Sequence, residues 1–387
     1  MSKWGSLAAR YEEEKPRKIL SLDGGGIRGV LTLEILLELE NQLSAALKKD
    51  EGFRLSDFFD YIGGTSTGAI IAAGLSRGMS VSELLKFYEE KGEAMFDKAF
   101  LLKRVKYFYN EGPILKELQN TFGASDIDLR SGGFKTLLLV VTMNRSTDSP
   151  WPISNNPNSK YNTPDRDDCN LRIPLYQLVR ASTAAPAYFK PETLQWGPND
   201  PEKTFVFVDG GVTPYNNPAF LMYRMATQVP YNLNWKTGEK ELLIVSVGTG
   251  SAPSPGAYNN LFDTLKDLPN NLMYTMQVEQ DINCRTVGRC IFGAPIDREL
   301  GDMVPLDSEG NVLPLNSDAN RHFGYVRYNA NLSEGGLNEM GLGHIDSDSV
   351  SQMDSVQFMP QLREVGRTTG KTQVKISEHF QNFLPKG

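Results

Sequence analysis

The 387-residue chain has 40 Lys and Arg residues against 47 Asp and Glu residues, a formal net charge of −7. This balance provides no general basic surface, so duplex nucleic acid is excluded as an expected partner. The length and the 40% hydrophobic content suit one large globular domain or two smaller ones.

Cysteine content and the N-terminal sequence bear on location. Cys169, Cys284 and Cys290 are too few and too widely spaced for a disulfide framework or a zinc site, so we expect reduced thiols in a cytoplasmic protein. Residues 1–16 form a polar N-terminal segment without the apolar region of a secretory signal. No run of about 18 uncharged apolar residues occurs, so any action on lipid is expected from the membrane surface.

The first part of the chain alternates between strand-like and helix-like segments. Residues 17–22 predict a buried strand that ends at a glycine-rich loop, and residues 30–48 carry leucines at helical spacing. Residues 58–64 predict a second strand, and the small apolar residues 69–75 are typical of the start of a buried helix. This alternation predicts an α/β fold with a mostly parallel sheet.

Three further strands are predicted, at residues 135–143, 204–208 and 241–247. Each ends in a polar or glycine-rich turn. Because ligand sites of open α/β sheets gather at the carboxyl ends of strands, we expect the functional site at that edge. Helices are predicted at residues 81–99, 113–121, 175–183 and 218–228.

The later segments are less regular. Residues 146–170 are rich in Pro, Asn, Ser and Asp and predict a long surface loop. We expect a core at residues 17–255 and a C-terminal extension at residues 256–387, packed on the same domain. Within the extension, helices are predicted at 258–280 and 371–384, and a strand at 323–328.

A Gly-x-Ser-x-Gly turn, Gly64-Thr65-Ser66-Thr67-Gly68, follows the second predicted strand. Between a strand and a helix, this pattern exposes the serine Oγ on a strained backbone, and the flanking glycines let neighbouring segments approach. The start of the next helix adds free N–H groups. Ser66 is therefore a candidate nucleophile, and a structural turn is the alternative.

The first predicted strand ends at Asp23-Gly24-Gly25-Gly26-Ile27-Arg28-Gly29. The amides of Gly24, Gly25 and Gly26 have no Cβ in the way and suit an anion or an oxyanion, and Arg28 offers a contact to a lipid phosphate. The same glycines fit the Gly-x-Gly-x-x-Gly fingerprint of dinucleotide binding. That fingerprint requires a second strand ending in an acid, whereas residues 43–50 resemble a helix end. A structural glycine turn is a further alternative.

The candidate base is Asp209, which ends a predicted strand and is followed by Gly210-Gly211. A carboxylate there can reach a serine at a neighbouring strand end, and burial can raise its pKa toward the value that a base needs. The alternative for Asp209 is a turn residue. His322, His344 and His379 lie in the least regular part of the chain.

With these motifs the chain resembles the patatin-like phospholipase family. Residues 23–29 are similar to its oxyanion-hole loop, residues 64–68 to its nucleophile elbow, and Asp209-Gly210-Gly211 to its catalytic aspartate block. Residues 181–186 with Phe189, and the turn at 246–250, also fit the family. No motif matches after about residue 255.

The resemblance implies a three-layer α/β/α sandwich and a serine lipid acyl hydrolase of phospholipase A or lysophospholipase type. It implies a Ser66–Asp209 dyad that needs neither a metal nor a cofactor, an acyl-enzyme, and an oxyanion held by the loop at Gly24–Gly26. The implied partner is the phospholipid membrane surface. Two other functions stay open: a histidine-triad esterase using His322 or His344, and a non-catalytic nucleotide-binding protein using the glycine loop.

Two features concern membranes and regulation. Residues 96–109 interleave basic and aromatic side chains, which suits a membrane-surface segment or a helix packed on the core with a solvated basic face. Some bacterial members of the family act in antiviral defence, where a cyclic oligonucleotide switches on membrane degradation. The resemblance therefore raises a cyclic oligonucleotide activator as an expectation, with Arg321, Arg327 and the C-terminal extension as the place left for it.

Overall fold

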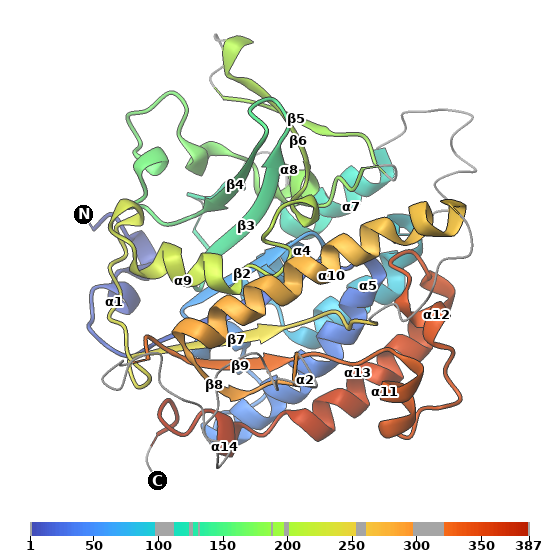
Figure 1. Cartoon of the computed structure of the whole chain (residues 1–387). Helices are drawn as coiled ribbons and strands as arrows, with labels where there is room; N and C mark the ends of the chain where they lie inside the picture. Colours follow the sequence, from blue (N-terminus) through green and yellow to red (C-terminus); the bar gives the residue numbers. More distant parts are fainter. Residues whose placement is uncertain are drawn as a thin grey trace.

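The computed structural model describes residues 2–96, 112–123, 127–130, 132–186, 189–196, 201–252, 261–296 and 321–385 (Figure 1). The strands are β1 (Arg17–Leu22), β2 (Tyr61–Thr65), β3 (Leu137–Asn144), β4 (Ser149–Ser154), β5 (Glu192–Gln195), β6 (Thr204–Asp209), β7 (Leu242–Val247), β8 (Arg289–Phe292) and β9 (Gly324–Tyr328). The α-helices are α1 (Ala8–Tyr11), α2 (Gly29–Ala46), α3 (Leu55–Phe58), α4 (Thr67–Ser76), α5 (Val81–Phe96), α7 (Gly112–Phe122), α8 (Leu175–Ser182), α9 (Ala219–Thr227), α10 (Leu261–Val287), α11 (Glu334–Glu339), α12 (Ser347–Ser351), α13 (Met359–Gln373) and α14 (Ile376–His379).

The nine strands of the described chain form one sheet with the order β5-β6-β3-β2-β1-β7-β9-β8, and β4 also pairs with β3. From β3 through β2, β1, β7 and β9 to β8, neighbouring strands run parallel. Both β4 and β6 run antiparallel to β3, and β5 runs antiparallel to β6. The predicted α/β fold with a mostly parallel sheet is confirmed.

Helices cover both faces of the sheet. Because successive strand residues point to opposite faces, Leu20 and Leu22 of β1 pack in the cluster that contains α2, α4 and α13, whereas Ile19 packs in the cluster that contains α9. Figure 1 shows α9 and α10 on the near side of the sheet and α2 and α13 across it. The architecture is a three-layer α/β/α sandwich.

Two strands share one side of β3. Thr65, the last residue of β2, pairs with Val141, and Asp209, the last residue of β6, pairs with Thr142. On the opposite side, β4 pairs with both Val141 and Thr142. Because a strand residue can pair on two sides only, the carboxyl ends of β2 and β6 meet head to head along β3.

Two sequence predictions were wrong. The expected loop at 146–170 contains β4, an edge strand whose Pro150 and Pro152 are tolerated because an edge strand does not need every N–H. The helix expected at 371–384 is divided instead between α13 and α14, since Val374 has an extended backbone. Of residues 96–109, all but Phe96 lie outside the described part of the chain.

Residues after 255 contribute directly to the sheet. β9 pairs with β7, and β8 pairs with β9, so the sheet continues without interruption into this region. α13 packs closely along α2. The approach is so close that a Cβ on Gly366 would lie 2.7 Å from the Leu31 carbonyl oxygen. The described part of residues 256–387 thus packs on the same sheet as residues 17–255.

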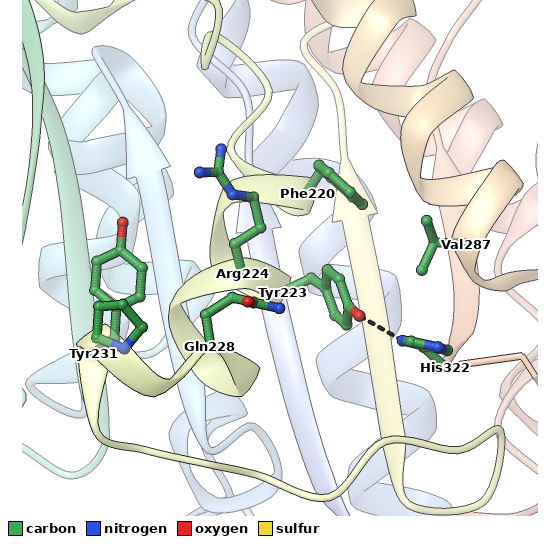
Figure 2. Close-up of a pocket in the computed structure, with 8 residues that line it drawn as sticks. Phe220, Tyr223, Arg224, Gln228, Tyr231, Val287 and His322 are labelled. Carbon is green, nitrogen blue, oxygen red and sulfur yellow. Dashed lines mark hydrogen bonds between the residues drawn. The ribbon is translucent and has the colours of Figure 1, made fainter.

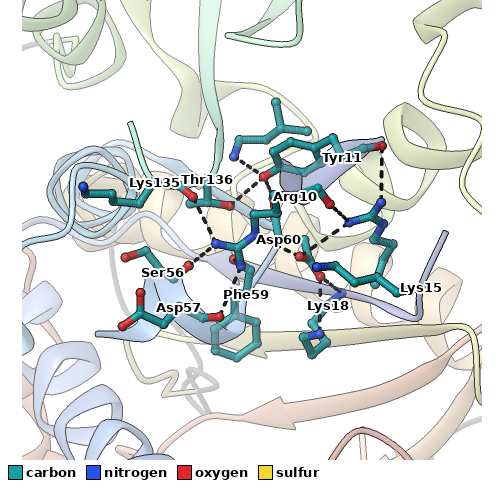
Figure 3. A network of polar contacts seen from close by, with 12 residues as sticks. Arg10, Tyr11, Lys15, Lys18, Ser56, Asp57, Phe59, Asp60, Lys135 and Thr136 are labelled. Atoms are coloured by element: carbon teal, nitrogen blue, oxygen red, sulfur yellow. Dashed lines mark hydrogen bonds and ion pairs between the residues drawn. The ribbon is translucent and has the colours of Figure 1, made fainter. Parts of the chain in front are cut away.

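The N-terminal segment is tied to the amino ends of the central strands (Figure 3). Arg10 Nε pairs with Asp60 Oδ1 at 3.0 Å, and the guanidinium also donates to the carbonyl oxygens of Ser56, Phe59 and Lys135. Asp60 Oδ2 accepts the Lys18 N–H at 3.0 Å. One arginine therefore joins the segments that precede β2 and β3 at the edge opposite the carboxyl ends.

Candidate active site

Ser66 stands at the turn between β2 and α4. Its φ of 55° is uncommon for a residue with a side chain and stores strain at this turn. A Cβ on Gly64 would lie 2.1 Å from the carbonyl oxygen of Gly68, and a Cβ on Gly68 would lie 2.3 Å from that of Leu22. Both glycines of the Gly-x-Ser-x-Gly pattern are therefore required by close backbone contacts.

The side chains of Ser66 and Asp209 are hydrogen bonded to each other. Ser66 Oγ donates to Asp209 Oδ2 at 2.7 Å. The other carboxylate oxygen, Oδ1, accepts the N–H of Gly211 at 2.6 Å. Because the backbone occupies one oxygen, the second oxygen stays directed at the serine.

The environment of Asp209 changes its acidity. Asp209 is only 5% exposed, and this burial raises the pKa of its carboxyl group to about 6. Hydrogen bonds from Ser66 and Gly211, and the positive charge of Arg180, oppose the rise. A carboxyl group with this pKa is ionised at neutral pH and is a better proton acceptor than an ordinary aspartate.

The glycine loop lies directly beside the serine. A Cβ on Gly24 would lie 3.3 Å from Ser66 Cβ and 2.3 Å from Asn216 Oδ1, so only glycine fits there. The Gly24 N–H donates to the carbonyl oxygen of Asn216 at 3.1 Å and is not available to a ligand. The described residues provide no acceptor for the N–H of Gly25 or Gly26, which leaves these two amides as candidate donors.

Arg28 turns inward and does not present its charge to solvent. It is 7% exposed, and its guanidinium donates to the carbonyl oxygens of Gly25 at 3.4 Å and Ser351 at 3.1 Å. Burial lowers the pKa of Arg28 to about 10. The neighbouring Ile27 N–H donates to the Met353 carbonyl oxygen at 2.9 Å. Arg28 thus holds the loop against a distant segment of the chain and does not point toward a lipid phosphate.

The loop is also held through the residue that precedes it. Asp23 is fully buried and forms two hydrogen bonds with Arg327 of β9, at 2.9 and 2.6 Å. Arg327 also donates to Ser246 Oγ at 2.7 Å. From the sequence, Arg327 is a candidate for a nucleotide site. In the structure, two of its guanidinium nitrogens bind Asp23 and Ser246, so Arg327 connects the loop to the sheet.

Ser182 of α8 is a site residue to which sequence reasoning gave no role. Its Oγ accepts the Ser66 N–H at 2.9 Å and donates to the carbonyl oxygen of Val141 at 2.7 Å. It thereby fixes the elbow backbone to β3. The motif at residues 181–186 marked this segment in the sequence, but it did not indicate the hydrogen bond between Ser182 and the Ser66 N–H.

The histidines lie away from the dyad. His322 precedes β9, at the amino ends of the parallel strands, and its Nδ1 is hydrogen bonded to the Tyr223 hydroxyl at 2.5 Å. His344 lies at the surface 3.3 Å from Glu364, and His379 Nδ1 is 2.8 Å from the Tyr328 hydroxyl. This placement gives Ser66 no histidine partner.

The glycine loop does not have the setting of a dinucleotide site. The segment at 43–50 contains the end of α2, and the next strand starts only at Tyr61. The third glycine of the fingerprint, Gly29, serves helix packing, since a Cβ there would lie 2.3 Å from Thr67 Oγ1. Within the described ranges, no group of three or more His, Cys, Asp or Glu side chains is arranged to hold a metal ion. No helix in the same ranges has both the length and the apolar character needed to cross a bilayer.

Comparison with known proteins gives a consistent result. Residues 20–223 match the family described as patatin-like phospholipase. Patatin-17 from Solanum cardiophyllum is 30% identical over 251 residues, which cover 60% of this chain and 60% of that protein. A cGAMP-activated phospholipase from Vibrio cholerae is 33% identical over 254 residues, covering 62% of this chain and 66% of the relative. A cGAMP-activated phospholipase from Escherichia coli is 28% identical over 244 residues, covering 61% and 63%.

The chain thus spans slightly less than two thirds of each of these relatives. The family match extends over more than half of the 387 residues and contains the glycine loop, the serine elbow and Asp209. The chain belongs to the patatin-like phospholipase family.

Proposed function

We propose that this protein is a serine hydrolase that cleaves acyl esters of membrane phospholipids through a Ser66–Asp209 dyad. The observation that carries the proposal is the 2.7 Å hydrogen bond from Ser66 Oγ to Asp209 Oδ2 at a strained elbow, beside a glycine loop with two amides left for an anion. The family to which the chain belongs supports a lipid ester as substrate.

In the first half of the reaction, Asp209 accepts the Ser66 hydroxyl proton as Oγ attacks the ester carbonyl carbon. The developing oxyanion is held by the N–H groups of Gly25 and Gly26, while the Gly24 amide keeps its bond to Asn216. Collapse of this intermediate breaks the ester bond, and Asp209 returns the proton to the departing alcohol. The lysophospholipid leaves and the acyl group stays on Ser66.

In the second half, a water molecule gives its proton to Asp209 and attacks the acyl-enzyme carbonyl. The same two amides hold the second oxyanion. Breakage of the Ser66 ester releases the fatty acid, and the proton on Asp209 returns to Ser66 Oγ. The raised pKa of Asp209, about 6, suits a group that must take up and release a proton twice in each cycle.

The proposed place of action is the membrane surface, which the protein reaches as a peripheral enzyme. The proposed regulator is a cyclic oligonucleotide, supported by the two relatives named as cGAMP-activated phospholipases. An enzyme that degrades membranes only when this signal is present suits a role in antiviral defence.

Fatty-acid release from mixed phospholipid liposomes tests the proposal, with wild type beside Ser66→Ala and with Ser6→Ala as a matched control at an exposed serine. Each protein is measured with and without cGAMP. We expect release by wild type and Ser6→Ala, and none by Ser66→Ala. Equal release by Ser66→Ala would refute the dyad. Release that does not depend on cGAMP would remove the regulator and leave the hydrolase.

A fluorophosphonate probe separates an inactive site from a wrong substrate. We expect covalent labelling of wild type that is lost in Ser66→Ala. If wild type neither releases fatty acid nor accepts the label, with or without cGAMP, the serine is not a nucleophile and the proposed function is wrong.

A further inference from the structure

A polar cavity lined by Arg327 lies outside the dyad. It has a volume of about 170 Å³ and lies between α10 and the segments that follow β7, β8 and β9. Figure 1 shows α10 running over the near side of the sheet. The strand ends at the cavity are carboxyl ends of parallel strands, the edge at which open α/β sheets bind ligands.

The α10 wall of the cavity holds polar side chains without partners. Gln277 is 6% exposed and lines the cavity, and the described residues offer no hydrogen-bond partner to its amide. Tyr274, one turn earlier, also lines it, and its hydroxyl has no described partner either. The Gln277 amide atoms are not fully enclosed by protein, so the amide faces the cavity with hydrogen-bonding capacity left for a polar ligand.

The opposite wall connects the cavity to the active site. Arg327 lines the cavity and also makes the two hydrogen bonds to Asp23, the residue before Gly24. Asn329, also in the lining, accepts the Gly250 N–H at 2.9 Å. One side chain, Arg327, therefore separates the cavity from the start of the loop that holds Gly25 and Gly26.

A larger cavity of about 550 Å³ lies along α9 (Figure 2). Its polar lining residues Arg224, Gln228 and His322 are exposed at the surface. Tyr223 and His322, in the same lining, already satisfy each other through their hydrogen bond. Its link to the site is the 3.5 Å contact between Arg224 and the Tyr215 hydroxyl. The smaller cavity has the unpaired Gln277 amide and the shorter route to the glycine loop.

We propose that the cavity behind Arg327 binds one purine base of the cyclic nucleotide activator, an inference that rests on the activation proposed above. The volume is that of about six water molecules, which suits a single heterocyclic base. The Gln277 amide is the group type that pairs with the hydrogen-bonding edge of adenine, and Tyr274 offers a ring for stacking. A bound base packs beside Arg327 and restricts the motion of the Asp23–Arg327 pair, which orders the loop amides for the oxyanion.

Calorimetric titration of the full chain with cGAMP tests the site without using catalysis. The variants are Gln277→Leu and Tyr274→Leu, with Glu279→Gln as the control on the exposed face of the same helix. Arg224→Ala reports on the cavity along α9. Circular dichroism verifies that each variant is folded, and cyclic di-UMP serves as a ligand without purines.

We expect Gln277→Leu and Tyr274→Leu each to weaken cGAMP binding about tenfold or more, with Glu279→Gln and Arg224→Ala close to wild type. We also expect the concentration of cGAMP that gives half-maximal activation to rise by the same factor, and cyclic di-UMP not to bind. Wild-type binding by both cavity variants, or loss of binding in Arg224→Ala alone, would overturn the assignment. So would a wild-type protein that labels with the fluorophosphonate probe but binds no cGAMP, a result that leaves the hydrolase standing.

Discussion

Thr65 and Asp209, the last residues of two strands that run in opposite directions, pair with consecutive residues of β3. The dyad follows from this geometry, because Ser66 comes directly after Thr65 and the Asp209 side chain lies at the same junction. The approach of the two strand ends is close: a Cβ on Gly210 would lie 2.3 Å from the Val141 carbonyl oxygen and 3.0 Å from Thr65 Cγ2. The backbone thus brings Ser66 and Asp209 together without a loop that must be ordered separately.

Replacing the base without changing its shape separates chemistry from folding. We expect Asp209→Asn to lower kcat about 10²-fold to 10⁴-fold, because the amide cannot accept the Ser66 proton. The same substitution should stabilise the fold at pH 8. The folded pKa of Asp209 is about 6, above its ordinary value, so the stability tied to the protonated form is lost as pH rises through 6.

The amide of the Asp209→Asn variant carries no buried charge and avoids that loss, which amounts to about 3 kcal/mol at pH 8. Urea unfolding of both proteins at pH 8 and at pH 4 measures it, and the gain should shrink toward zero at pH 4. A variant that is less stable than wild type at both pH values would show that the buried charge of Asp209 does not destabilise the fold.

The pH dependence of the wild-type enzyme should follow Asp209. With a water-soluble ester, log kcat/KM should rise by about one per pH unit below pH 6 and become level above it, since only the ionised carboxylate accepts the proton. A soluble substrate keeps membrane charge out of the measurement. A profile whose rise is centred above pH 7 would assign the base to another group.

The glycine loop should tolerate no side chain at Gly26. Its φ of 60° disfavours other residues, and a Cβ would lie 2.2 Å from the Met353 carbonyl oxygen. We expect Gly26→Ala to lower kcat about 10²-fold by displacing an oxyanion donor. Gly335→Ala is the matched control, because nothing lies within 4 Å of its added Cβ. Similar kcat values for both variants would show that the loop adapts.

Arg327 should act on stability through Asp23. Arg327→Met leaves the Asp23 carboxylate buried without its partner, and we expect a loss of about 3–5 kcal/mol in urea unfolding. The double variant Asp23→Asn, Arg327→Met should recover a large part of this loss. Arg145→Met, which breaks an exposed pair with Asp148, should change little. Equal losses in the single and double variants would argue against a specific charge pair.

Ser182 should act on turnover through the elbow backbone. Ser182→Ala removes the acceptor of the Ser66 N–H and should lower kcat about tenfold, with KM and the pH profile unchanged. Thr227→Ala serves as the control, because the Thr227 hydroxyl bonds only within its own helix in the described chain. An unchanged kcat for Ser182→Ala would mean that β2 and α4 position Ser66 without help from α8.

Much of the central sheet was predictable because buried parallel strands are continuous apolar runs. β1, β7 and β9 fall within a residue or two of the predicted ranges, and Ser66 and Asp209 were found from the glycines that follow each strand. β4 was missed because its two prolines are typical of loops, although an edge strand accepts them. The antiparallel direction of β6 depends on long-range pairing with β3, which has no local signal.

The contacts around the glycine loop could not be predicted for the same reason. No local pattern pairs Asp23 with Arg327, or Arg28 with the Ser351 carbonyl oxygen, 323 residues further along the chain. The short sequence around Gly24–Gly26 indicates three exposed amides. Only the folded chain shows that the Gly24 amide is used by Asn216.

The hydrogen bonds from Ile27 and Arg28 to residues 351–353 also set the order in which the glycine loop can form during protein synthesis. The Ser351 carbonyl group that holds Arg28 is synthesised 323 residues later, and the Met353 carbonyl group that holds Ile27 follows it. A ribosome-bound chain that already contains Ser66 and Asp209 therefore lacks the contacts that shape its oxyanion loop. A growing polypeptide would acquire the final shape of this loop only after residues 351–353 have emerged from the ribosome.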